Sequence, residues 1–457
     1  MMDGNRPGPS ARPRNANRKA PRMPAEHPAM PPALPPAPRS FDDALGRRIV
    51  DLHVWAVRLG LLGTAAETLF DGFCQRLVIA GVPLWRAFAG MRTLHPQWAG
   101  YGYTWRRDLN AIQPAQWERG GDIDPPWRDS PFAYMMAQSA LASPTAPNTE
   151  PWLQLRRRLV GPDALLDFPV LAEFAAAGAT DYFAQIVRFG TEGDPSRGTG
   201  VAYSFTTRRP EGFGDDDLTL LQATLPALSL AIMSHAGHTI AAGLLAAYLG
   251  GDAGRRVHAG AVERGSVESI DAVLWFADLR GFTALADASP GLDLIELLDE
   301  MFETLTAALR PRGGEVLKFL GDGMLAIFPV ATSGRAATCR AALDAAAAAM
   351  QAIAALNLTR EAAGKRAASV DVALHLGEVL YGNVGAADRL DFTAIGPAVN
   401  LAVRLEGLTK RLGRPLLMSS DFAHACRRRL VSLGFQPVKG ISEPEEVFGL
   451  PETSGEI

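Results

Sequence analysis

Apolar runs of strand-like length lead to chain reversals between residues 271 and 328 of this 457-residue chain. The segment begins with 272–277, a nearly continuous apolar run that is typical of a strand buried on both faces. A helical pattern follows around 293–310. Two further apolar runs flank Gly321-Asp322-Gly323, a sequence typical of a hairpin turn. The pattern therefore predicts a strand, a helix and a β-hairpin.

The same half of the chain continues with a long Ala-rich helix over about 334–356 and strands near 369–376 and around Val379. Strand–helix–strand–strand–helix–strand is the ferredoxin-like order, in which helices cover one face of a sheet. We therefore expect an α+β domain of this type over residues 268–457.

The N-terminal half combines helical and strand-like patterns in another order. We expect helices over about 45–59 and 65–80, strands over 85–94 and 101–106, a loop over about 119–151, a helix within 163–178, and strands over 182–189 and 200–207. The segment 212–217, Gly-Phe-Gly-Asp-Asp-Asp, then supplies N-cap candidates for a long Leu-rich helix. This order, and above all the Gly-Phe-Gly-Asp-Asp-Asp-Leu segment, resembles a GAF-like sensory domain. The resemblance implies an α/β GAF-like regulatory domain over residues 41–216, with an unknown sensor ligand or partner protein.

Residues 217–267 are expected to form a helical linker that breaks at Gly250-Gly251. The segment 218–251 contains no Asp, Glu, Lys or Arg, and its length could span a bilayer. Polar residues spread through its middle are costly in lipid and favour a long helix partly buried in a dimer stalk. A membrane span is the alternative.

Composition and charge add expectations about the N-terminal segment, the binding partners and the cellular compartment. Residues 1–40 are rich in Pro, Ala and Arg and cannot bury enough apolar surface to become ordered, so we expect a disordered tail. The net charge of −4 gives no reason to expect nucleic acid or an anionic membrane as a partner. Cys74, Cys339 and Cys426 are odd in number and far apart, without disulfide or zinc spacing, which favours a reducing cytoplasm.

Two carboxylates stand at chain reversals in the C-terminal half. Asp278 follows the strand 272–277, and Asp322 occupies the hairpin turn. Acids at the ends of neighbouring strands repel each other unless a cation lies between them, and two hard oxygen ligands with little else nearby suit Mg²⁺. Either residue alone would be an ordinary surface or turn aspartate, but both in one compact unit, with Lys318 just upstream, favour a metal site.

A helix that begins at Gly396-Pro397 carries a second candidate pair. Asn400 and Arg404 are four residues apart and project together, beside the apolar stripe of the helix. Alone the pair could decorate a solvent-exposed face, but an arginine fork is what a phosphoryl-type transition state needs. The apolar stripe consists of Ala398, Leu401, Leu405, Leu408 and Leu412.

Four motifs make residues 268–450 similar to the catalytic domain of a class III nucleotidyl cyclase. They are Phe-Ala-Asp-Leu-Arg-Gly-Phe-Thr, Leu-Lys-Phe-Leu-Gly-Asp-Gly, His-Leu-Gly-Glu-Val and Thr-Ala-Ile-Gly-Pro-Ala-Val-Asn-Leu-Ala-Val-Arg-Leu-Glu, in this order. Residues 41–250 are similar, more weakly, to regulatory regions that accompany bacterial cyclases of this type.

The resemblance implies a role for each matching position. Asp278 and Asp322 would hold two divalent metal ions, Mg²⁺ or Mn²⁺, with the backbone carbonyl of Leu279 assisting. Lys318 would hydrogen-bond the adenine ring, and Thr393 occupies the position of the second base-reading residue, where many members carry Asp. Because adenine N1 accepts a hydrogen bond and guanine N1 donates one, Lys318 with Thr393 favours ATP over GTP.

The same resemblance assigns the ribose and the phosphates of the substrate. Asn400 would orient the ribose, Arg404 would stabilise the α-phosphate in the transition state, and Lys439 would contact the terminal phosphates. The implied adenylate cyclase reaction is in-line attack of the ribose 3′-oxygen on the α-phosphorus, which forms cyclic AMP and releases pyrophosphate. No dedicated protein base is obvious near these motifs.

The resemblance also implies a head-to-tail homodimer with active sites at the interface. Asp278 and Asp322 of one chain would meet the base, ribose and phosphate residues of the other. Because one sequence contains both half-sets, a two-fold dimer would have two complete sites. A sensor could then control the rate by moving the protomers.

Three alternatives stay open from the sequence. A guanylate cyclase is disfavoured by Lys318. A catalytically silent dimeric signalling scaffold is disfavoured because Asp278, Asp322, Asn400 and Arg404 are all present. A membrane receptor cyclase would require the segment 218–251 to enter a membrane.

Overall fold

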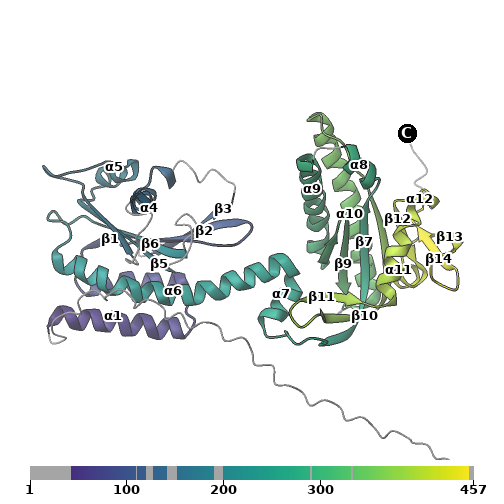
Figure 1. Cartoon of the computed structure of the whole chain (residues 1–457), viewed down its shortest axis with the longest axis horizontal. Coiled ribbons are helices and arrows are strands. Elements are labelled where there is room, and N and C mark those ends of the chain that lie inside the picture. Colours follow the sequence, from purple (N-terminus) through teal and green to yellow (C-terminus); the bar gives the residue numbers. More distant parts are fainter. Residues whose placement is uncertain are drawn as a thin grey trace, which may run out of the picture.

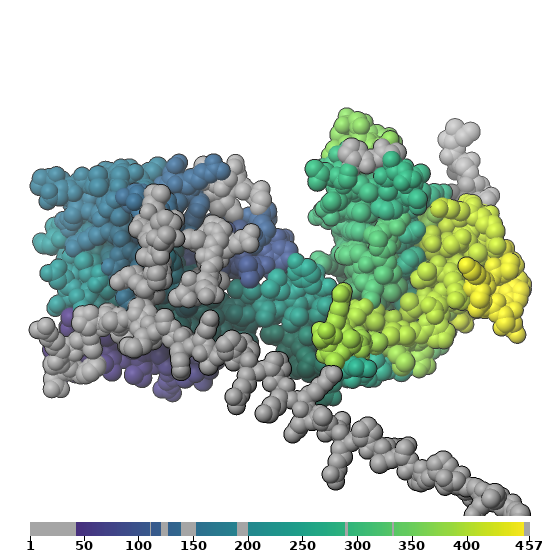
Figure 2. All heavy atoms as spheres, in the orientation of Figure 1, coloured from purple at the N-terminus to yellow at the C-terminus, as the bar shows by residue number. Residues whose placement is uncertain are grey.

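The computed structural model describes residues 43–109, 111–119, 127–141, 152–189, 199–288, 291–330 and 333–451. The tail expected at 1–40 lies outside these residues. The described chain forms two units, which are joined by the long helix α6, Asp215–Leu249 (Figure 1). In the space-filling view the purple and blue N-terminal unit and the green and yellow C-terminal unit form separate masses on either side of teal residues (Figure 2).

A six-stranded sheet with strand order β3-β2-β1-β6-β5-β4 forms the centre of the N-terminal unit. The strands are β1 Leu84–Arg92, β2 Trp98–Arg106, β3 Ala111–Glu118, β4 Trp152–Arg158, β5 Asp181–Phe189 and β6 Thr199–Thr207. All neighbouring strands pair antiparallel. The expected α/β class is therefore wrong for this unit, because α/β sheets are built from parallel strands joined by crossover helices. The unit is α+β.

Helices cover both faces of this sheet (Figure 1). One face is packed by α1 Ala44–Leu61, α2 Ala66–Ile79 and α6, around a core that includes Phe70, Phe73 and Leu228. The other face is packed by α4 Pro131–Leu141 and α5 Pro169–Ala176. Helix α4 lies inside the segment where we expected only a loop.

The start of α6 is anchored by a fully buried carboxylate, Asp181 of β5. Its Oδ2 atom lies 2.7 Å from Arg156 Nη2 and 3.4 Å from Arg158 Nη1, and it accepts a 3.0 Å hydrogen bond from the backbone N–H of Phe213. Arg156 also donates to the carbonyl of Phe213 at 2.7 Å. The network fixes the loop that leads directly into the helix joining the two units.

Replacing Asp181 by alanine should lower the free energy of unfolding of the N-terminal unit by about 3 kcal/mol, because it leaves two guanidinium groups and a backbone N–H without their buried acceptor. Denaturant unfolding followed by circular dichroism measures this loss. Asp167→Ala is the matched control: this carboxylate pairs with Arg157 at 2.9 Å in a more exposed position, so its loss should cost about 1 kcal/mol or less. Equal losses in the two variants would contradict the anchoring role.

The C-terminal unit is built on a second sheet with strand order β13-β14-β12-β10-β7-β9-β8, and β11 pairs with β10. Its elements are β7 Val267–Leu279, α8 Phe282–Ala288, α9 Gly291–Leu309, η2 Arg310–Arg312, β8 Glu315–Leu320, β9 Gly323–Pro329, α10 Gly334–Ala362, β10 Val370–Gly385, β11 Leu390–Ile395, α11 Pro397–Glu406, α12 Thr409–Leu412, β12 Leu416–Ser419, α13 Ser420–Cys426, β13 Val431–Gln436 and β14 Glu445–Gly449. The central order β10-β7-β9-β8 is the ferredoxin-like one that the sequence predicts. The two strands expected near 369–376 and Val379 are one long strand, β10.

Two layers of helices pack against this sheet. Helices α9 and α10 cover one face, around buried Trp275, Met301 and Phe328. On the other face, Ala398 and Ala402 of α11 join a smaller core that includes Leu274. We expected helices on one face only, and α11 therefore extends the predicted arrangement.

The two units are connected through a short helix, α7 Gly251–His258. Helix α6 ends at Leu249, where the glycines predicted a break, and Gly250 adopts a φ of 89°. The backbone N–H of Asp252 donates to the carboxylate of Glu315, the first residue of β8. The connection thus contacts the same strand that carries Lys318.

Two helices of the described chain, α6 and α10, are long and apolar enough to cross a membrane by length and composition alone. The core helix of a soluble protein passes the same criterion, and α10 packs in the core of the C-terminal unit. Cys74, Cys339 and Cys426 are free and buried.

Candidate active site

Asp278 and Asp322 lie close together at one end of the central strands. Asp278 is the second-last residue of β7 and is paired in register with Gly323, while Asp322 lies in the turn between β8 and β9. A Cβ atom at Gly323 would lie 3.1 Å from Asp278 Oδ1, so glycine leaves room for the carboxylate. Burial raises the pKa of Asp278, and the neighbouring Asp322 raises it further.

A cation fits this pair, because it would relieve the repulsion that raises the pKa of Asp278. No group of three or more His, Cys, Asp or Glu side chains suited to a metal exists in the part of the chain that the structure describes. Two carboxylates are enough for Mg²⁺, which keeps waters and takes further ligands from phosphates. Leu279, whose carbonyl we expect to assist, is the last residue of β7.

A further acid, Glu406, reaches this end of the sheet and was missed by sequence reasoning. It is the last residue of α11 and stands two residues after Arg404 in the motif that identified this helix. The pKa of Glu406 is raised to about 7, mainly by burial and also by the nearby carboxylates of Asp278 and Asp371. Lys410 has the opposite effect on this pKa. Asp371 itself is held by Arg280, whose Nε donates to it at 3.0 Å.

The raised pKa of Glu406 predicts a pH effect on the metal-free protein. The pKa of Glu406 is about 7 in the folded state, compared with an ordinary value of 4.5. The folded state therefore binds this proton more tightly than the unfolded state does. As pH rises from about 4.5 to 7, the folded state loses stability relative to the unfolded state. Between these pH values the wild type should lose roughly 1–2 kcal/mol of unfolding free energy through Glu406, after allowance for solvent screening. Replacing Glu406 by glutamine should remove this loss. Thermal unfolding in EDTA between pH 5 and 8 measures it; identical pH profiles of the variant and the wild type would rule it out.

Lys318 on β8 forms an ion pair with Asp391 on β11, two residues before Thr393. Thr393 is buried, with 8% of its surface exposed. The Lys318–Asp391 ion pair thus connects the strands that carry the two expected base-reading residues. Asp391, to which we assigned no role, is their acidic neighbour.

Arg404 lies beside the loop that carries Lys439. Its Nη1 donates to the carbonyl of Gly440 at 3.2 Å, and a Cβ atom at Gly440 would lie 3.2 Å from its Nη2. Asn400 and Arg404 are both exposed on α11, as their spacing predicts. The helix ends at Glu406, however, so Leu408 and Leu412 follow it in a turn and in α12, and the continuous stripe that we expected is wrong beyond that point.

The predicted residues therefore form three groups: Asp278 with Asp322, Lys318 near the strand of Thr393, and Arg404 beside the Lys439 loop. Among the described residues, no hydrogen bond or ion pair connects one group to another.

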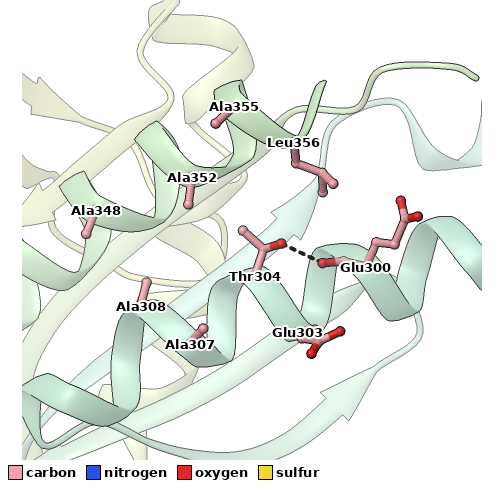
Figure 3. A pocket seen from close by; sticks show the side chains of 9 residues that line it. All are labelled: Glu300, Glu303, Thr304, Ala307, Ala308, Ala348, Ala352, Ala355 and Leu356. Carbon is pink, nitrogen blue, oxygen red and sulfur yellow. Dashed lines mark hydrogen bonds between the residues drawn. The ribbon is translucent and has the colours of Figure 1, made fainter. Parts of the chain in front are cut away.

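A shallow groove lies between α9 and α10, apart from the predicted site residues. Its volume is about 560 Å³, and alanines of both helices line it, with Glu300 and Glu303 at one side (Figure 3). Thr304 Oγ donates to the carbonyl of Glu300 at 2.7 Å there. None of the predicted site residues lines this groove.

The C-terminal half of the chain is similar to known cyclases. Residues 266–419 match the family described as the adenylate and guanylate cyclase catalytic domain. The chain is 32% identical over 164 residues to an adenylate cyclase of Anabaena cylindrica, covering 35% of this chain and 32% of the relative. It is 30% identical over 178 residues to adenylate cyclase 1 of Rhizobium meliloti, covering 38% of this chain and 26% of the relative.

The chain thus spans no more than about a third of the length of these curated relatives. Among solved structures, a bacterial light-regulated adenylyl cyclase matches with a TM-score of 0.42 and 25% identity, over 50% of this chain and 64% of that one. The adenylyl cyclase CyaB from P. aeruginosa matches with a TM-score of 0.38 and 26% identity, over 41% of this chain and 97% of that one. Residues 266–419 thus match the catalytic domain of class III adenylate and guanylate cyclases.

Proposed function

We propose that this chain is an adenylate cyclase that converts ATP into 3′,5′-cyclic AMP and pyrophosphate. The observation that carries the proposal is the position of Lys318, next to the strand of Thr393 and on the hairpin whose turn holds Asp322. A lysine ammonium can donate to adenine N1, whereas guanine N1 is itself a donor. Two relatives that match this domain are named adenylate cyclases.

Asp278 and Asp322 would hold two divalent metal ions, Mg²⁺ or Mn²⁺, with the Leu279 carbonyl assisting. When bound, these ions would lower the cost of ionising the ribose 3′-hydroxyl and of releasing pyrophosphate. The raised pKa of Asp278 supports this assignment, since a carboxylate pair with that repulsion is suited to a cation.

The remaining residues would bind and orient the nucleotide. Asn400 would position the ribose so that its 3′-oxygen lies in line with the α-phosphorus. Arg404 would donate its fork to the α-phosphate oxygens as charge develops on them. Lys439, in the loop that Arg404 contacts, would bind the terminal phosphates.

We further propose that two chains form a head-to-tail homodimer. The absence of direct bonds between the three groups of site residues in the described chain supports it, because a partner could supply the complementary groups. A two-fold arrangement would give two complete sites.

The N-terminal unit would act as a GAF-like sensor in a cytoplasmic protein. Its antiparallel sheet with helices on both faces and its exit through α6 support this role. The bond from Asp252 to Glu315 gives α6 and α7 a contact with β8, so movement of α6 could reach Lys318.

The substrate preference is tested by replacing Lys318 with glutamate. ATP turnover should fall on the order of a hundredfold, because the variant loses the donor to adenine N1 and places a carboxylate there. GTP turnover should fall much less. Initial rates of cyclic AMP and cyclic GMP formation measure both activities.

Lys365→Glu is the matched control for this experiment. Lys365 pairs with Glu296 at 2.8 Å, away from the site residues, so both activities should stay near those of the wild type. A Lys318→Glu variant that loses both activities equally would show that Lys318 does not read the base.

A further inference from the structure

Helices α4 and α5 cover one face of the N-terminal sheet (Figure 1), and three arginines contact Trp85 and Phe174 of the core on that face. The guanidinium carbons of Arg208 and Arg106 lie 3.9 Å and 5.8 Å from the ring centre of Trp85. That of Arg86 lies 4.9 Å from the ring centre of Phe174 on α5. These three arginines together with Trp85 are called the arginine cluster below.

Arg86 is the least neutralised member of the arginine cluster. In the part of the chain that the structure describes, its guanidinium forms no ion pair, and its side chain makes only a long hydrogen bond, 3.5 Å, to the hydroxyl of Thr104. Burial lowers the pKa of Arg86, and the nearby Arg106 lowers it further, while Tyr182 raises it. The side chain of Arg86 is half-buried, and a partly desolvated guanidinium without an anion is unfavourable, since buried charges are normally paired.

The charged groups near Arg86 do not neutralise its positive charge. Arg106 is paired with Asp108, through contacts of 3.0 and 2.5 Å. That pair is at the surface, with more than a third of each side chain exposed. Arg208 donates to the backbone carbonyl of Ala177 at 2.7 Å, which is a neutral acceptor.

An independent observation comes from the indole of Trp85. Only 8% of the residue is exposed, and its Nε1 atom is buried without a hydrogen-bond partner among the described residues. The N–H of a buried tryptophan usually finds an acceptor. Arg106, whose guanidinium is near the Trp85 ring, is paired in register with Arg86, so the unpartnered indole donor and the weakly bonded Arg86 fork lie in the same part of the sheet.

We propose that the arginine cluster binds a small organic anion, a carboxylate or a phosphate ester, whose oxygens accept hydrogen bonds from the Arg86 fork and from Trp85 Nε1. A planar guanidinium matches the two oxygens of either group. The site lies in the N-terminal unit, on the face opposite α6, and it does not depend on the proposed cyclase activity. It assigns a chemical class to the signal that this unit receives.

The test is a titration of the full-length protein, carrying ¹⁵N-labelled indoles, with inorganic phosphate and, separately, with benzoate. The Nε1–H signal of Trp85, assigned by its loss in Trp85→Phe, should move and saturate with at least one probe. A response to phosphate alone assigns a phosphate ester, and a response to benzoate alone assigns a carboxylate. In Arg86→Met the dissociation constant should rise roughly tenfold or more, because a bidentate charge-assisted contact is lost.

Two controls keep the result decisive. Arg157→Met removes an arginine that is paired with Asp167 and should leave the titration unchanged. Without added anion, Arg86→Met should unfold at the same temperature as the wild type or higher, since it removes an unpaired charge. The proposal is overturned if the Trp85 signal responds to neither probe, if it responds equally in Arg86→Met, or if that variant unfolds several degrees lower.

Discussion

Replacing Asp278 by alanine is expected to lower cyclic AMP formation about a thousandfold or more. Metal assistance in transfer of this kind supplies several kcal/mol of transition-state stabilisation, and each 1.4 kcal/mol is about tenfold in rate. Asp278 is one of the two carboxylates that the structure places at the end of β7 and in the β8–β9 turn. Turnover of ATP by the purified variant, with Mg²⁺ or Mn²⁺ in excess, measures the loss.

The stability of the same variant separates a catalytic defect from a folding defect. The pKa of Asp278 is raised by burial and by Asp322, so its charge opposes folding in the metal-free state. Asp278→Ala should therefore unfold at the wild-type temperature or above in EDTA. Asp344→Ala, which removes an exposed carboxylate that contacts Arg428 at 3.5 Å, is the activity control and should keep full turnover. If Asp278→Ala retained more than about a tenth of the activity, a metal role would be untenable.

The second large effect is expected at Arg404. Replacing it by alanine should reduce turnover about a thousandfold, the effect typical of an arginine that stabilises a phosphoryl transition state. Because Arg404 contacts the loop of Lys439 and makes no direct bond to Asp278 or Asp322, the two defects should lie in different halves of the site.

Co-expression tests that division directly. Asp278→Ala and Arg404→Ala chains, each almost inactive alone, should together recover about a quarter of wild-type activity, because half of randomly formed dimers are mixed and each mixed dimer has one intact site. Activity should not recover when a single chain that carries both substitutions is expressed alone, because neither site of its homodimer is then intact. Absence of recovery in purified mixed dimers would contradict the shared-site arrangement.

Much of the catalytic fold was predictable because its strands are buried on both faces. The runs 272–277 and 324–328 are apolar almost without interruption, and the glycine-flanked Asp322 marks the turn between them. The break at Gly377 in β10 misled the prediction, since glycine and Glu378 interrupt the pattern. The structure gives the reason: a Cβ atom at Gly377 would lie 2.7 Å from the side chain of Ala398 on α11.

The parts that were missed depend on tertiary surroundings. Strand β3 is mostly exposed, so it lacks the apolar alternation that identifies a strand. Glu406 is unremarkable in the sequence, and only its burial beside Asp278 and Asp371 raises its pKa. The environment of Arg86 is likewise invisible until the sheet brings this residue against Phe174 and Arg106.

Initial rates of ATP and GTP turnover by the purified full-length chain, each with Mg²⁺ and with Mn²⁺, test the central claim most directly. The account predicts that cyclic AMP forms from ATP much faster than cyclic GMP forms from GTP, and that Asp278→Ala abolishes the product. Cyclic GMP as the main product would contradict the role given to Lys318 and Thr393. No cyclic nucleotide from either substrate with either metal, both from the full-length chain and from residues 268–457 alone, would contradict the enzyme itself and favour a silent scaffold.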